Sequence, residues 1–205
     1  MSKAAALRPA ARAGAPYATV SLREALADPA LLGNVLVGES WATWRSLLLA
    51  TMGERLTADE LAIFQRVTAR TLAPPSRVEE AAFVVGRRGG KDRAASVLAC
   101  YLAALVDWSP VLVKGERGLV LCIGPDQRQA KIQRDYIEGA FDTSPVMASL
   151  ISGRTADSIE LSNRVSVEVR AASFRRLRGV TCVAVIATEA GGRRTREAGI
   201  PTARS

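Results

Sequence analysis

The sequence predicts an α/β fold, a sheet with helices packed on both of its sides. From Glu80 onward, short apolar runs alternate with segments of helical periodicity, which is the order of elements in such a fold. One run, "VTCVAVIA" at residues 180–187, is apolar throughout, as expected of a strand buried on both faces. The chain has 205 residues, 48% of them hydrophobic and 23% charged, so it can form one sizeable core.

The first third of the chain predicts a tail followed by helices. Residues 1–20 lack acidic residues and are rich in Ala, Pro and Gly, which favours a disordered tail over the transit peptide that they superficially resemble. Residues 21–75 are expected to form a helical segment that begins where a serine precedes a glutamate at capping-box spacing. Helices are predicted at residues 41–50 and 58–71, and "LAPPSR" ends the second because proline cannot continue a helix.

The sheet is expected within residues 76–190. A first strand, "AAFVV", ends at a glycine turn, and a helix with apolar residues at i, i+3 and i+4 spacing begins at Lys91. A second strand, "GLVLCIG", and a second helix, "DQRQAKIQRDYIEGAF", follow. "SIELSNRVSVEV" alternates polar and apolar residues on both sides of a turn, which predicts a hairpin, and "VTCVAVIA" is the last strand.

The positive charge is concentrated at the two ends of the chain. The formal net charge is +8, and Lys3, Arg8 and Arg12 supply +3 of it. The last fifteen residues add another +3, from four arginines against one glutamate. A basic patch on the folded body, the usual mark of a nucleic-acid surface, is therefore weakly supported.

Composition also excludes several classes of chemistry. The sequence has no histidine, which excludes Ser-His nucleophile pairs and zinc sites that contain histidine. Cys100, Cys122 and Cys182 lie in apolar segments and are expected to be buried thiols in a reducing, cytoplasmic setting. The longest uncharged apolar run, residues 94–106, is too short to span a bilayer, so no membrane span is predicted.

The segment "VVGRRGGKDR" at residues 84–93 is a candidate anion site. It joins the first strand to the first helix, so backbone N–H groups and the positive end of the helix dipole converge there. Lys91 would supply a charge for the outer phosphates of a nucleotide. The pattern GxxxxGK[ST] is not met, because Val85 holds the first glycine position, Gly86 is one residue late and Asp92 replaces the hydroxyl residue. A glycine-rich connection with a solvated lysine is the alternative.

A second candidate element is the end of the last strand, at Thr188 and Glu189. Phosphate-loop NTPases place a carboxylate at such a strand end to hold Mg²⁺, often followed by a glutamate that orients the attacking water. Glu189 suits the second role, whereas Thr188 stands where the metal-binding carboxylate is expected. The alternative is a strand that simply ends in polar residues.

Several blocks in this order resemble the large terminase subunit of tailed bacteriophages, the ATP-driven motor that packages DNA into capsids. The resemblance runs from about Trp41 to Ala190, through "ESWATWRSLL", "GERLTADELAIFQRVTAR", "VVGRRGGK", "GPDQRQA", "DSIELSNRVSVEVRAASFRRLRG" and "VAVIATEA". It implies a P-loop NTPase (RecA-like) sheet with flanking helices, ATP and Mg²⁺ as cofactors, and a Walker A element at the glycine loop. "VIATEA" resembles a Walker B element that usually reads Asp-Glu-Ala.

The resemblance also assigns roles to individual residues. The nucleotide-binding residues it implies are Gln65, Arg70, Gly86, Arg87, Arg88, Gly89, Gly90, Lys91 and Asp92. The positions that it gives to metal ligands are held here by Asp92 and Thr188, both of which depart from the family's residues, and it implies Glu189 as the catalytic residue. A basic run is a candidate nucleotide sensor or DNA contact, with a solvated loop as the alternative: Arg175, Arg176 and Arg178.

A complete terminase continues beyond the Walker B strand with the rest of the sheet and a nuclease domain. Neither is expected here, so the sequence predicts an ATPase domain that is incomplete at its C-terminus, with residues 191–205 as a disordered tail of frameshift-like composition. The partners implied are double-stranded DNA, the phage portal, the small terminase subunit and copies of the chain in a ring, in the cytoplasm of a bacterial host. ATP binding with impaired turnover is expected. The alternative is a non-catalytic remnant or accessory module that binds DNA or partners.

Overall fold

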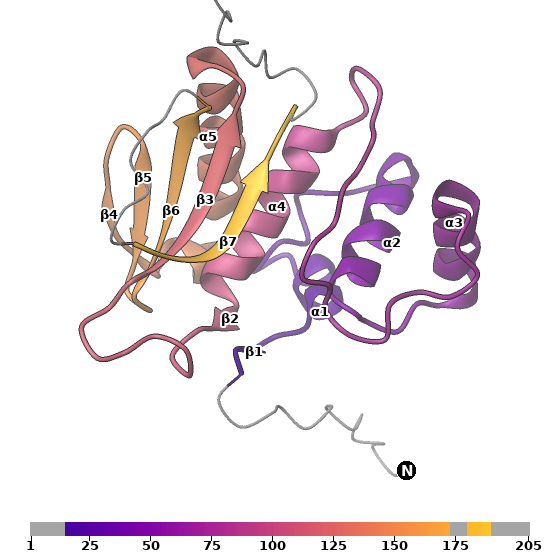
Figure 1. Ribbon diagram of the computed structural model, residues 1–205, viewed down its shortest axis with the longest axis horizontal. Coiled ribbons are helices and arrows are strands. Elements are labelled where there is room, and N and C mark those ends of the chain that lie inside the picture. The colour runs from indigo at the N-terminus through magenta and orange to yellow at the C-terminus, as the bar shows by residue number, and fades with distance from the viewer. Residues whose placement is uncertain (1–14, 173–179, 190–205) are drawn as a thin grey trace, which may run out of the picture.

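The computed structural model describes residues 15–172 and 180–189, which form an α/β structure (Figure 1). Within these residues, five strands make a mixed sheet in the order β4-β5-β6-β3-β7. Their bounds are Gly118–Gly124 (β3), Ile151–Arg154 (β4), Ser158–Leu161 (β5), Val165–Ala171 (β6) and Thr181–Ala187 (β7). β3 runs parallel to β6 and β7, whereas the β4-β5-β6 meander is antiparallel. The predicted strand "GLVLCIG" and the predicted hairpin are confirmed.

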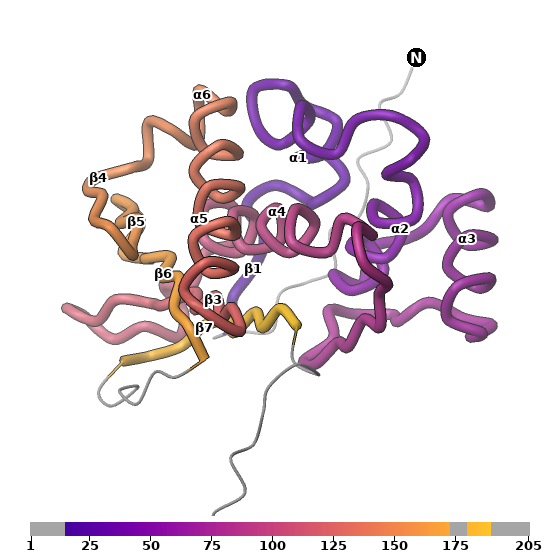
Figure 2. The backbone as a smooth tube through the Cα atoms, turned by 90° about the horizontal axis from the view of Figure 1, so that it is seen from above, coloured from indigo at the N-terminus to yellow at the C-terminus, as the bar shows by residue number. Residues whose placement is uncertain are grey.

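One face of the sheet is covered by two helices. α4 spans Lys91–Ala104 and α5 spans Gln127–Asp142, and both lie on the same side of the strands (Figure 2). β6 shows the corresponding pattern, since Val165, Val167 and Val169 are buried and the residues between them are half-buried. The expectation of helices on both sides of the sheet is therefore wrong for the described part of the chain.

A layer of shorter helices lies beside α4. These helices are α1 (Leu22–Ala27), the 3₁₀ turn η1 (Glu39–Trp41), α2 (Ala42–Thr51) and α3 (Ala58–Thr68). α1 and α3 begin with capping boxes, in which Ser21 pairs with Glu24 and Thr57 with Glu60. α3 ends three residues before the predicted limit because Ala69 takes a left-handed conformation, φ 56°. The short helix α6 (Pro145–Ala148) follows α5.

The tail prediction is wrong at its inner end. Tyr17–Ala18 forms β1, which pairs with β2 (Val106–Asp107) after α4. The Tyr101 hydroxyl donates to the carbonyl of Val20 at 2.9 Å, so the same stretch is also held against α4. The hydrophobic core is continuous from α1 and α2 through α4 and α5 to β6, so the predicted helical segment and sheet share one core.

The predicted strand "AAFVV" is not a strand. Residues 79–86 have no regular secondary structure, and Val84 is fully exposed. An apolar run becomes a strand only when another strand satisfies its backbone groups, and no described strand pairs with this one.

β7 is a strand as predicted, but it is not buried on both faces. Within the described residues it pairs only with β3, and Val185 keeps 57% of its surface exposed. Cys182 on the same strand is exposed, contrary to expectation, whereas Cys100 and Cys122 are buried as expected. Burial raises the pKa of the Cys122 thiol to about 12, which keeps that thiol protonated.

Candidate functional site

The glycine loop turns tightly before α4. Its turn is closed by a hydrogen bond from the N–H of Gly89 to the carbonyl of Gly86, at 3.2 Å. Gly90 is the N-cap of α4, with φ 76°, and a Cβ there would lie 2.8 Å from ring carbons of Trp41. Both the positive φ and the close indole require glycine at this position. The first turn of α4 and the arrowheads of β3, β6 and β7 are at the same end of the sheet (Figure 1), and α4 begins with Gly90 as its N-cap and Lys91 as its first residue.

Lys91 joins the loop to the end of β7. Its Nζ lies 3.0 Å from Oε1 of Glu189 and 3.6 Å from Oδ2 of Asp92. The hydrogen bond to Glu189, helped by Asp92, raises the pKa of Lys91 above its ordinary value, so the ammonium group is charged at neutral pH. Residues 98 positions apart in the sequence are thus brought together at one cation.

Thr188 lies beside this cluster but is mostly buried, with 7% of its surface exposed. Its N–H donates to the carbonyl of Ile123 at 3.0 Å, which continues the pairing of β7 with β3. Among the described residues no group of three or more His, Cys, Asp or Glu side chains is placed to hold a metal ion. Two carboxylates, those of Asp92 and Glu189, lie next to the Lys91 ammonium group.

A cavity of about 720 Å³ opens next to the loop, between α2, α3 and residues 78–85. Its walls are largely apolar and aromatic, with a few polar groups. The residues that line it include Trp44, Phe64, Arg70, Phe83, Val85 and Gly89. The volume of this cavity lies within the range of small-molecule sites.

Trp44 connects the cavity to the loop. Its Nε1 donates to the carbonyl of Gly89 at 2.6 Å, and its ring meets Phe83 edge-on, with ring centres 5.6 Å apart. Trp41, one turn earlier, lies under the guanidinium of Arg93 at 5.2 Å. Neither tryptophan was among the predicted site residues. The two tryptophans are three residues apart in the sequence, on one side of a predicted helix. No local sequence pattern places that helix against the glycine loop.

The remaining predicted site residues are distributed unevenly. Arg70 lines the cavity, whereas Gln65 does not, and its amide donates to the carbonyl of Thr71 at 2.8 Å. Arg87 and Arg88 are exposed on the loop. The candidate sensor or DNA contacts lie outside the described residues: Arg175, Arg176 and Arg178.

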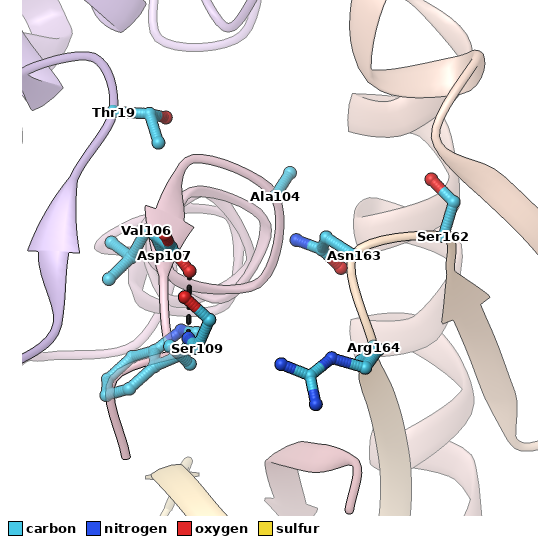
Figure 3. A pocket seen from close by; sticks show the side chains of 9 residues that line it. Thr19, Ala104, Val106, Asp107, Ser109, Ser162, Asn163 and Arg164 are labelled. Atoms are coloured by element: carbon cyan, nitrogen blue, oxygen red, sulfur yellow. Dashed lines mark hydrogen bonds between the residues drawn. The ribbon is translucent and has the colours of Figure 1, made fainter. Parts of the chain in front are cut away.

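A second cavity, of about 500 Å³, lies at the opposite end of the sheet (Figure 3). Its polar groups already serve the fold, since Asn163 donates to the carbonyl of Ala103 and the Asp107 carboxylate accepts the N–H of Ser109. That N–H also lowers the pKa of Asp107. The cavity lies at the amino end of β3, because Arg164 lines it and the carbonyl of Arg164 accepts the N–H of Gly118, the first residue of β3. Ligands of open α/β sheets bind at the carboxyl end, so the glycine loop is the stronger candidate.

Known proteins offer no guide to this site: no family model matches the chain, and no curated protein or solved structure is significantly similar to it. None of the described helices is long and apolar enough to cross a membrane.

Proposed function

We propose that the chain binds a nucleoside triphosphate at the glycine loop, as the P-loop ATPase part of a DNA-packaging motor of the terminase type. One observation carries the proposal: Lys91, directly after two glycines and at the amino end of α4, faces Glu189 at the carboxyl end of β7. A loop, a cation and a strand-end glutamate that meet at this edge are the parts that NTP binding needs. The double-stranded DNA, portal, small-subunit and ring partners belong to the same proposal.

The loop would hold the phosphates. α4 has 14 residues, and its first helical hydrogen bond runs from the N–H of Ala94 to the carbonyl of Gly90. The N–H groups of the residues before Ala94 are therefore not used by the helix, and they lie at the positive end of its dipole. Lys91 adds a full charge, and a phosphate oxygen would replace the Glu189 carboxylate on its ammonium group.

The adjoining cavity would hold the base. The rings of Trp44 and Phe83 offer apolar and π surface, and Arg70 supplies a cation at the wall. A planar base would be recognised mainly by stacking and exclusion of water, with Arg70 as the polar contact. Gln65 would have to exchange its hydrogen bond to Thr71 for one to the base.

The residues fit Mg²⁺ only in part. Mg²⁺ binds nucleotides through one or two carboxylates plus phosphate oxygens and waters, and it neutralises phosphate charge. Asp92 and Thr188 are the candidate ligands at the loop and at the end of β7, and Glu189 would orient water after it leaves Lys91. Because Thr188 offers a hydroxyl in place of a carboxylate, we expect the chain to bind the nucleotide but to hydrolyse it slowly.

Replacing Lys91 tests the proposal. Lys91→Ala should weaken ATP binding at least about tenfold, because a charge-assisted phosphate contact contributes roughly 1.5–3 kcal/mol. Titration calorimetry of the wild type and the variant gives the comparison. Lys131→Ala, the same change at an exposed position of α5, is the matched control and should bind as the wild type does. Equal titration curves for the wild type and Lys91→Ala would show that Lys91 does not contact the phosphates and would contradict the proposal.

A further inference from the structure

We infer that Trp44 is the positioning residue of the phosphate loop: its indole N–H fixes the peptide group between Gly89 and Gly90 in the orientation that presents an N–H donor to the anion. The inference rests on the proposed function. It adds a residue outside the loop, on α2, whose contact determines what the loop can bind.

The peptide between two glycines needs such an anchor. Glycine has no Cβ, so the chain on either side of this peptide can rotate with little steric resistance. A peptide group is planar and trans, so the carbonyl of Gly89 and the N–H of Gly90 point in opposite directions. A flip of this one peptide would therefore exchange a donor for an acceptor at the loop, and a carbonyl oxygen repels a phosphate.

The contacts around Trp44 are those of a fixed anchor. Nε1 lies 2.6 Å from the Gly89 oxygen, and only 8% of the Trp44 surface is exposed. The edge-on contact with Phe83 restrains the ring, and a Cβ on Gly90 would lie 2.8 Å from ring carbons of Trp41 and 3.4 Å from Nε1 of Trp44. Because the carbonyl is held toward α2, the N–H of Gly90 is directed away from α2.

The chain provides a matched control for the indole N–H. Trp108 is equally buried, with 6% of its surface exposed, and its Nε1 donates to the carbonyl of Leu102 at 2.7 Å. Its cation neighbour is Arg77, and it lines the cavity at the far end of the sheet. Trp44→Phe and Trp108→Phe thus remove the same kind of hydrogen bond, one at the loop and one away from it.

The experiment titrates tripolyphosphate, ATP and adenosine into the wild type and both variants. Trp44→Phe should weaken tripolyphosphate and ATP binding about fivefold to tenfold, the size of one hydrogen bond, and change adenosine binding less than twofold because an aromatic ring remains. Trp108→Phe should leave all three affinities unchanged. A purely structural role would lower the melting temperature of both variants without this difference between ligands.

The outcomes separate the two proposals. If the wild type binds neither tripolyphosphate nor ATP, the proposed function fails and this inference fails with it. If the wild type binds both and Trp44→Phe binds them equally well, the function stands and the role of Trp44 is overturned.

A second measurement does not depend on the folding of Trp44→Phe. The sequence has three tryptophans, so in Trp108→Phe the emission comes from Trp41 and Trp44. Tripolyphosphate should change this emission in a saturable way, with the dissociation constant found by calorimetry. Binding without any change in emission would contradict an indole in contact with the loop.

Discussion

Two carboxylates hold the cation that the phosphates would need. Glu189 and Asp92 both pair with Lys91, and Glu189 makes the shorter contact. If the proposed site binds phosphate, the phosphate competes with a carboxylate of the same chain for the ammonium group. Glu189 itself takes a left-handed backbone conformation, φ 54°, which is uncommon for a residue with a side chain.

Removing the charge of Glu189 should raise the affinity for phosphates. We expect Glu189→Gln to bind tripolyphosphate up to about fivefold more tightly, because a partly exposed ion pair contributes up to about 1 kcal/mol. ATP hydrolysis, if the wild type shows any, should fall in the same variant. Glu138→Gln, which breaks the ion pair with Arg134 on α5, is the control for calorimetry. Unchanged affinity in Glu189→Gln would show that the contact does not compete with phosphate.

Among the residues that the structure describes, Gln133 has the most buried side-chain polar atoms without a hydrogen-bond partner. It is fully buried on α5, and neither its Oε1 nor its Nε2 has a hydrogen-bond partner among the described residues. Gln133→Met keeps an unbranched side chain of similar length and should raise the free energy of unfolding by about 1–2 kcal/mol, since an unpaired buried amide is costly. Urea denaturation measures the change. Gln127→Met, at the exposed first turn of α5, should have little effect, and a destabilised Gln133→Met would mean that the amide is paired.

At the scale of elements, a bidentate ion pair joins α1 to α3. Arg23 on α1 donates from Nη1 and Nη2 to the two oxygens of Glu60, at 2.8 and 2.7 Å. Glu60 also accepts the N–H of Thr57 as part of the capping box of α3. The Glu60 carboxylate thus caps the start of α3 and also holds α1 next to it.

This pair predicts acid sensitivity. Arg23, as the main cause, lowers the pKa of Glu60 from 4.5 to about 2. A carboxyl whose pKa is lower in the folded chain stabilises the fold above pH 4.5, and this stabilisation is lost as the pH falls toward 2. Because the Arg23 and Glu60 side chains are 39% and 21% exposed, we expect about 1 kcal/mol from the pair. Urea denaturation at pH 5 and pH 3 should show a larger loss for the wild type than for Glu60→Gln, and parallel losses would exclude the pair as the cause.

At the scale of the whole molecule, one core joins the helical layer to one face of the sheet, and β7 and β4 are the two edge strands of that sheet in the described chain. An edge strand presents unpaired backbone groups, and Val185 adds exposed apolar surface beside them. The β7 edge of the described sheet is therefore suited to pairing with another strand.

Self-association through this edge is the expected consequence. Light scattering of the wild type should show a mass that rises with concentration, and Val185→Lys should reduce this rise because a charged side chain opposes edge pairing. Val37→Lys places the same charge on an equally exposed valine before η1, away from the sheet, and should not reduce it. A wild type that stays monomeric at all concentrations would contradict the role of the edge.

Much of this protein could be predicted from short stretches of sequence. The capping box at Ser21, the start of α4 at Lys91, the bounds of β3 and the β5-β6 hairpin all follow from patterns within a few residues. Hydrogen bonds within a helix or across a tight turn involve neighbours in the chain, so the sequence specifies them locally. The loop and Glu189 were found in the same way, because glycines and strand ends can be read in place.

Only the tertiary structure decided which apolar segments pair with another strand and which are buried. "AAFVV" has the composition of a strand but no described partner, and "VTCVAVIA" is apolar throughout yet lies at an edge. Burial and strand pairing depend on residues far away in the chain, which no local period reports. The contact of Trp44 with Gly89 bridges 45 positions, and that of Lys91 with Glu189 bridges 98. The sequence by itself therefore determined where the candidate site is, and only packing decided which side chains hold it.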